Sequence, residues 1–141
     1  MRYEIEVDID AASETVWAVL VDVERWPEWT PSMTSVQRLE DGPFGVGSTV
    51  RVRQPKLPQA VYTVTEYERG QAFSWAARSP GIMTAGGHQV VSHQDGHATV
   101  RLTLDQTGVL ASLVGLFAAR LAHRYVTMEA EGLKRRCESL P

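Results

Sequence analysis

The hydrophobic pattern of this chain changes its period once, and this change strongly limits the folds open to it. Between residues 49 and 106, short runs place apolar side chains at every second position, as half-buried β-strands do. After Gly108 the apolar residues recur at helical spacing instead, as Leu110, Leu113, Val114, Phe117, Leu121, Tyr125, Met128 and Gly132. The pattern predicts one long helix over residues 109–138, about 45 Å in length.

The region before residue 49 supplies further elements. Residues 2–10 alternate, which predicts a first strand. Ser13 is a good N-cap for a short helix over residues 15–21, and a second short helical segment is expected at 23–26, before Pro27. The other strands are expected at residues 33–39, 49–54, 59–68, 71–78, 88–93 and 99–106, with a type I′ turn at Asp95-Gly96 between the last two.

This order of elements predicts an α+β fold. Successive strands joined by tight turns form an antiparallel sheet. Such a sheet usually buries one face, and the long amphipathic helix is the element able to cover it. At 141 residues, one domain over residues 1–141 is the default, and it can bury a core together with an internal cavity.

Composition argues against several functional classes. The net charge of −3 lacks the basic footprint of a nucleic-acid-binding protein, and the Lys134–Arg136 cluster suits the solvated end of a helix. The single cysteine, Cys137, rules out an intramolecular disulfide. Neither a signal peptide nor a membrane span is evident, so we expect a cytoplasmic protein without stable membrane insertion. No residue spacing suggests a metal site, and no motif implies a cofactor.

Strand parity also predicts which side chains share the covered face of the sheet. The expected apolar members are Val50, Val52, Val64, Phe73, Ala77, Val90, Val100, Leu102 and Leu104. The expected polar members are Gln54, Tyr62, Glu66, the Trp75 indole and His88. A solid core would not need so many polar groups, whereas a pocket for a largely apolar ligand uses a few to orient it. Gly86-Gly87 is a candidate bulge that would shift this register.

Several segments of the chain resemble one known family. They are VWAVLVDVERWPEWTPSM at 16–33, GVGSTVRVRQP at 45–55, YTVTEYERGQAFSW at 62–75 and YVTMEAEGLKRRCE at 125–138. Their order and spacing resemble the START-like superfamily SRPBCC, in its polyketide cyclase/dehydrase-like branch of small bacterial proteins. The resemblance implies a helix-grip fold. In this fold a seven-stranded antiparallel sheet wraps around a long C-terminal helix, two short helices follow the first strand, and a deep cavity lies between sheet and helix.

The resemblance also implies where a ligand would lie. Members of the family bind lipids, sterols, polyketides, quinones or plant hormones, and some catalyse cyclisation or aromatisation. It places Trp26 and Trp29 near the cavity mouth, although the alternative is that both rings plug the end of the sheet. The helix stripe would form one cavity wall through Phe117, Leu121, Tyr125 and Met128. Independently of the resemblance, the strand parity described above predicts that Gln54, Tyr62, Trp75 and His88 orient the ligand.

Two functions remain open at this point, with a third behind them. The first is the binding or carriage of a hydrophobic small molecule, such as a lipid, polyketide, quinone or aromatic compound. The alternative is a cyclase, aromatase or dehydratase in which His88 or Glu66 moves a proton, although no nucleophile–base arrangement is recognisable. The third is an interaction module, because the first half of the long helix is apolar almost all round. That excess suits a buried helix, a homodimer contact or a lipid surface.

Overall fold

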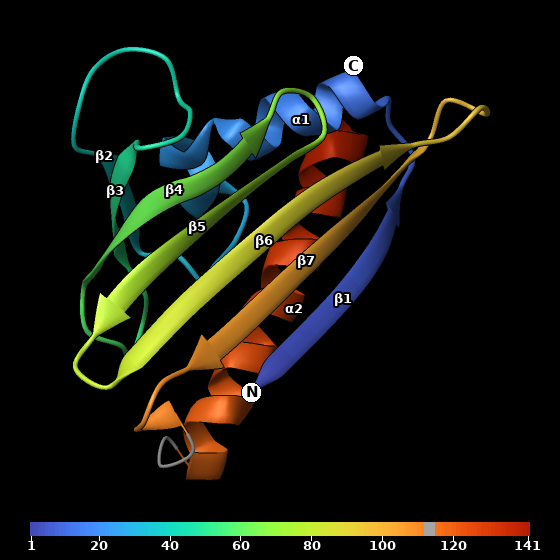
Figure 1. Cartoon of the computed structure of the whole chain (residues 1–141). Helices are drawn as coiled ribbons and strands as arrows, with labels where there is room; N and C mark the ends of the chain where they lie inside the picture. The colour runs from blue at the N-terminus through green and yellow to red at the C-terminus, as the bar shows by residue number, and fades with distance from the viewer. Residues whose placement is uncertain (112–114) are drawn as a thin grey trace.

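Seven antiparallel strands form one sheet in the computed structural model, which describes residues 1–111 and 115–141 and, for 115–117, the backbone alone. The strands are β1 (Arg2–Ile9), β2 (Ser35–Arg38), β3 (Thr49–Arg53), β4 (Ala60–Glu68), β5 (Ala72–Ser79), β6 (Ile82–Ser92) and β7 (Ala98–Thr107). Across the sheet they lie in the order β1-β7-β6-β5-β4-β3-β2 (Figure 1). The first strand therefore pairs with the last, and all other neighbours follow one another in sequence.

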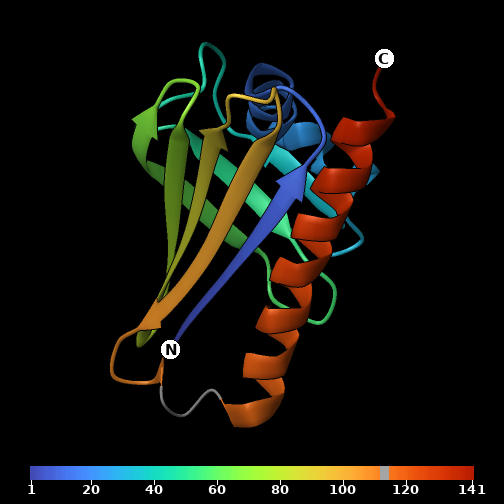
Figure 2. The same ribbon diagram turned by 90° about the vertical axis from the view of Figure 1, so that its right-hand side faces the viewer.

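Three helical segments accompany the sheet. They are α1 (Ser13–Val21), the 3₁₀ helix η1 (Val23–Glu28) and the long α2 (Gly115–Ser139). Figure 2 shows α2 running along one face of the sheet, with α1 and η1 at one end, beside the C-terminal half of α2. A sheet wrapped around a long C-terminal helix, with two short helices after the first strand, is the helix-grip arrangement expected from the sequence.

The alternation of side chains across the sheet was predicted correctly for most strands. Val50, Val52, Phe73, Val100 and Leu102 are all buried on the covered face. The inward placement of Glu66 was wrong. The pairing of β4 with β5 shifts between Val64 and Glu66, and this bulge reverses the parity, so Glu66 is exposed. Tyr67 turns inward instead and packs against Trp17, with the ring centroids 5.8 Å apart.

Strand β6 and the turn that follows it differ from the expectation. β6 begins at Ile82 and pairs with β5 and β7 without interruption, so Gly86-Gly87 is not a bulge. Neighbouring side chains approach the backbone closely at these glycines. A Cβ on Gly87, for example, would lie 2.3 Å from Thr103 Oγ1. The Asp95-Gly96 turn is not type I′, since that turn needs a positive φ at both central residues and only Gly96 has one, at +87°.

The long helix begins later than its hydrophobic pattern predicts. Gly108 has a φ of +113°, and the amide of Leu110 donates a hydrogen bond of 2.9 Å to the Gly81 carbonyl, so residues 108–111 turn back against the β5–β6 turn. The described helix then starts at Gly115. The predicted apolar stripe of this helix includes Leu113, Val114 and Phe117. The first two residues and the side chain of Phe117 lie outside the described part of the chain.

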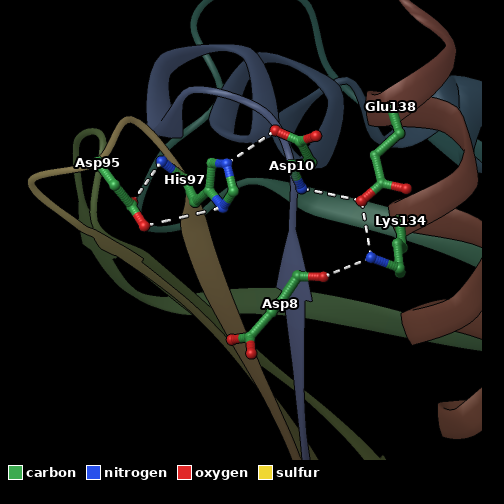
Figure 3. Close-up of polar contacts among 6 residues, drawn as sticks. All are labelled: Asp8, Asp10, Asp95, His97, Lys134 and Glu138. Carbon is green, nitrogen blue, oxygen red and sulfur yellow. Dashed lines mark hydrogen bonds and ion pairs between the residues drawn. The ribbon is translucent and has the colours of Figure 1, made fainter.

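A polar network holds the C-terminal end of α2 to the sheet (Figure 3). The Lys134 ammonium donates to the Asp8 carbonyl at 2.8 Å and to the Glu138 carboxylate at 2.7 Å. Glu138 in turn accepts from the Asp10 amide at 2.8 Å, and Asp10 contacts His97 of the β6–β7 hairpin at 2.9 Å. The Asp10 amide and Lys134 lower the pKa of the Glu138 carboxyl, so the network links β1, the hairpin and α2 while Glu138 is ionised.

Candidate ligand-binding cavity

A cavity of about 250 Å³ lies between the covered face of the sheet and α2. Its walls come from the middle strands and from one side of the helix. The sheet side is made by residues such as Val52, Ala60, Gly86, Leu102 and Leu104, and the helix side by Ala118, Ala122, Tyr125, Val126 and Glu129. Leu57 and Pro58, exposed residues of the β3–β4 connection, belong to the lining, so the cavity reaches the surface there.

The structure brings half of the sequence-predicted site residues together around this cavity. They are Gln54, Tyr62, Trp75, His88 and Tyr125. Trp26, Trp29, Leu121 and Met128 are not part of its lining. The side chain of Phe117 lies outside the described residues.

The two tryptophans near Pro27 pack inside the molecule instead. Trp26 is fully buried against Trp29 and Trp75, and its indole nitrogen donates to the Leu20 carbonyl at 2.9 Å. The carbonyl of Trp29 lies so close to α2 that a Cβ on Gly132 would come within 2.0 Å of it. This packing resembles the alternative given above for Trp26 and Trp29, in which both rings fill the end of the sheet instead of lining the cavity mouth.

His88 lies on β6 at the inner side of the cavity and is held in one orientation. Its Nδ1 donates to the Phe73 carbonyl at 3.1 Å, and its ring stacks on the Phe73 ring at a centroid distance of 4.3 Å. Burial lowers the pKa of His88 to about 4, although the bond to Phe73 opposes this shift. The imidazole is therefore neutral at pH 7, with Nε2 left as an acceptor.

Glu129 is the chemically most distinctive residue of the cavity, and the sequence reasoning missed it. It lies on α2, and its carboxyl forms no ion pair or hydrogen bond within the part of the chain that the structure describes. Burial raises the pKa of Glu129 to about 8, so the group is mostly protonated at neutral pH. A signal was present, because Glu129 follows Tyr125 by four residues and Ala122 by seven, which places all three on one helix face.

Aromatic side chains line the same cavity as this carboxyl. Tyr62 on β4 and Trp75 on β5 both line the cavity, with ring centroids 5.2 Å apart. Burial, with a smaller contribution from the charge on Glu129, raises the pKa of Tyr62 to about 12. Tyr125 donates its hydroxyl hydrogen bond to the Pro55 carbonyl at the cavity rim. The Trp75 indole nitrogen and the Tyr62 hydroxyl make no hydrogen bond to the described residues and remain free for a ligand.

Gly86 shapes the inner wall beside Trp75. A Cβ on this residue would lie 3.1 Å from Trp75 Nε1 and 3.3 Å from Cδ1, so even a methyl group would press on the indole edge. The missing side chain therefore leaves space next to the indole N–H, where a ligand group can approach it.

Metal binding and membrane insertion find no structural support in the described part of the chain. Among residues 1–111 and 115–141 no three His, Cys, Asp or Glu side chains are placed to hold a metal ion. None of the helices there is both long enough and apolar enough to cross a membrane.

Fold and cavity together define a small helix-grip protein with an internal, mainly apolar chamber. The chain belongs to the polyketide cyclase / dehydrase and lipid transport family, whose model matches residues 1–138. No curated protein matches the sequence significantly.

Solved structures share the fold at low sequence identity. A START superfamily protein from Mycobacterium smegmatis is 19% identical, with a TM-score of 0.82 and 99% of each chain covered. The Zhui aromatase/cyclase from Streptomyces sp. R1128 is 16% identical, with a TM-score of 0.80, covering 98% of this chain and 93% of that one. The di-domain ARO/CYC BexL of the BE-7585A biosynthetic pathway is 20% identical, with a TM-score of 0.74, covering 96% of this chain and 45% of that one.

Proposed function

We propose that this protein binds a small, largely apolar molecule in the cavity between the sheet and α2. The observation that carries the proposal is a mainly apolar lining that contains polar groups without a hydrogen-bond partner among the described residues, namely Glu129, Tyr62 and the Trp75 indole. Buried polar groups are normally hydrogen-bonded, so groups left without a partner around a cavity favour a ligand that supplies one. Membership of a family named for both cyclases and lipid transport agrees with this function.

Cavity size narrows the ligand. A volume of about 250 Å³ exceeds the ~150 Å³ that holds benzene in an engineered protein cavity, and lies just below the usual range of drug-sized pockets. A ligand of about two fused rings fits this space, whereas a sterol or a long acyl chain needs the cavity to expand. Burial of such a ligand would stabilise the complex by roughly 25 cal/mol for each Å² of apolar surface removed from water.

A second candidate function is catalysis in the same cavity, as a cyclase, aromatase or dehydratase. A specific observation favours it: Glu129 holds a proton at neutral pH, while His88 offers a neutral nitrogen, so the lining contains both an acid and a base. Positioned acids and bases typically contribute about 10²–10⁴-fold to a rate. Two of the similar structures carry aromatase/cyclase names, which supports the same candidate.

Native mass spectrometry of the protein purified from its own host, followed by organic extraction, tests the proposal. We expect a stoichiometric apolar adduct whose mass and structure identify the ligand class. A protein that carries nothing, and that binds none of the naphthalene probes described below, would refute binding as its function.

Variants separate carriage from catalysis once a ligand is known. An enzyme should lose turnover in Glu129→Gln or His88→Ala while it still retains the ligand. A carrier should show no turnover and lose at most some affinity. Glu66→Gln is the matched control, because this exposed carboxyl on β4 lies away from the cavity.

A further inference from the structure

The charged groups around the cavity are unbalanced. Its described lining contains one carboxyl, Glu129, and no lysine or arginine. A ligand carboxylate would therefore meet no counter-charge in this space, and it would lie near a group that itself tends to become negative. Anions are disfavoured inside the cavity on these grounds alone.

Glu129 could act as the counter-ion of a cation, and no cationic side chain among the described residues pairs with it. An unpaired carboxylate is costly to bury, which is why Glu129 keeps its proton at neutral pH. A cation brought into the cavity would remove that penalty, because a buried charge becomes stable when it is paired and hydrogen-bonded. Nothing on the described sheet lining supplies this cation, so a ligand has to bring it.

The surroundings of Glu129 suit a cation in two further respects. The rings of Tyr62 and Trp75 lie side by side in the same lining, and aromatic faces attract an ammonium group that lies within about 6 Å. The lining is also rich in acceptors, with the free Nε2 of His88 and the amide oxygens of Gln54 and Gln106. An ammonium group offers three N–H donors and needs such acceptors.

We propose that the cavity selects a small aromatic amine, whose ammonium group pairs with the Glu129 carboxylate while its rings lie against Tyr62 and Trp75. This inference rests on the proposed function, because it names the ligand class of the same cavity. Charge balances on binding: the amine enters as its cation, Glu129 releases its proton to solvent, and the pair formed inside is neutral.

Three probes of similar size test this selection by isothermal titration calorimetry at pH 7.5. They are 1-naphthylmethylamine, 1-naphthylmethanol and 1-naphthoic acid, which are respectively cationic, neutral and anionic at this pH. We expect the amine to bind about tenfold more tightly than the alcohol, and the acid to bind more weakly than both, because only the amine completes the pair with Glu129. Buffers of different ionisation enthalpy should reveal about three quarters of a proton released for each amine bound, because Glu129 with a pKa of about 8 is protonated to that extent at pH 7.5, and none for each alcohol.

The Glu129→Gln variant keeps the shape of the side chain and removes its charge. In this variant we expect the amine to lose its advantage over the alcohol, while the affinity for the alcohol changes by no more than about threefold. Glu66→Gln, which alters an exposed carboxyl on β4, should leave all three affinities unchanged. Circular dichroism of both variants verifies the fold before binding is measured.

The pH dependence in the unmodified protein gives a second test that needs no variant. Between pH 6 and 8 the affinity for the amine should rise by at most about tenfold per pH unit. The reason is that the free-energy cost of deprotonating Glu129 falls as the pH rises. The other titratable groups facing the cavity are Tyr62 from β4, His88 from β6 and Tyr125 from α2 itself. His88 stays neutral in this range, and the Tyr62 hydroxyl stays protonated. The affinity for the alcohol should be flat or fall.

Different failures are distinguishable. If the alcohol binds as tightly as the amine, or the acid binds most tightly, the amine inference is overturned while binding of apolar molecules stands. If none of the three probes binds, the amine inference is overturned. If the protein from its own host also carries no apolar adduct, the proposed function is overturned with it.

Discussion

The Tyr125 hydroxyl donates a hydrogen bond to the backbone carbonyl of Pro55, which joins the middle of α2 to the connection between β3 and β4. Both ends of this bond lie next to the cavity, because Tyr125 and Gln54 belong to its lining. The turn that carries Pro55 is closed by a bond from the Leu57 amide to the Gln54 carbonyl, and it holds Lys56 at a φ of +66°. The helix therefore secures a tight turn at the cavity rim.

Removing this bond should loosen the rim without emptying the core. In Tyr125→Phe the ring remains and the hydroxyl is lost, so we expect the free energy of unfolding to fall by about 0.5–1.5 kcal/mol in urea titrations. Amide hydrogen exchange at residues 54–59 should become faster. Unchanged exchange there would show that the bond does not hold the turn.

Glu129 should make the protein less stable as the pH rises. Its pKa of about 8 in the folded protein lies above the ordinary value of 4.5. Its contribution to stability is therefore fully present below pH 4.5 and is lost as the pH rises through 8. Glu129→Gln removes this dependence. In urea titrations from pH 5 to 8, the free energy of unfolding of the variant should rise relative to that of the parent protein by up to about 1.4 kcal/mol per pH unit. Parallel profiles would show that the cavity does not raise the pKa of Glu129.

His88 should have the opposite effect at acid pH. Its pKa of about 4 in the folded protein lies below the ordinary value of 6.5. Its contribution to stability is therefore present above pH 6.5 and is lost as the pH falls towards 4. His88→Asn abolishes this titration while its amide can still donate to the Phe73 carbonyl. Between pH 6.5 and 5 the parent protein should lose up to about 2 kcal/mol relative to this variant. Equal losses in both proteins would mean that His88 takes up a proton as readily in the folded protein as in the unfolded chain.

Gly132 should be intolerant of even a methyl group, although it lies in a helix. Glycine to alanine in a helix interior usually stabilises by about 1 kcal/mol, but here the new Cβ would lie 2.0 Å from the Trp29 carbonyl oxygen. We expect Gly132→Ala to destabilise the fold by about 1–3 kcal/mol in urea titrations. Glu131→Ala, an exposed neighbour on the same helix, should change stability by no more than about 0.5 kcal/mol.

Gly86 should set the space available beside Trp75. In Gly86→Val the added side chain would occupy the cavity wall at the indole edge, so we expect the affinity for 1-naphthylmethanol to fall about tenfold or more. Gly45→Ala is the control, since a Cβ there meets nothing within 4 Å. Equal affinities in the two variants would place the ligand elsewhere in the molecule.

The two glutamates show how far sequence reasoning reached into the site. Period-2 parity is reliable along an uninterrupted strand, and it placed Tyr62, Trp75 and His88 on the covered face correctly. It failed at Glu66 because one bulge, which has no distinct sequence signal here, reverses the parity beyond Val64. Glu129 was missed for a different reason. A lone glutamate in a helix is usually solvated, so its spacing from Ala122 and Tyr125 was a weak signal. The packing of α2 onto the sheet shows that their shared helix face lines the cavity.

The sequence by itself determined the succession of elements, the antiparallel sheet and the faces that strands and helix bury. These follow from local periodicity, which depends on backbone geometry that neighbouring residues share. Only the tertiary structure decided where α2 begins, where β4 bulges, and which side chains from distant segments meet around the cavity. Those features depend on the packing of elements far apart in the chain, such as Gly132 against Trp29 and Glu129 near Tyr62. Electrostatic character was decided in the same way, because burial in the assembled cavity raises the pKa of Glu129.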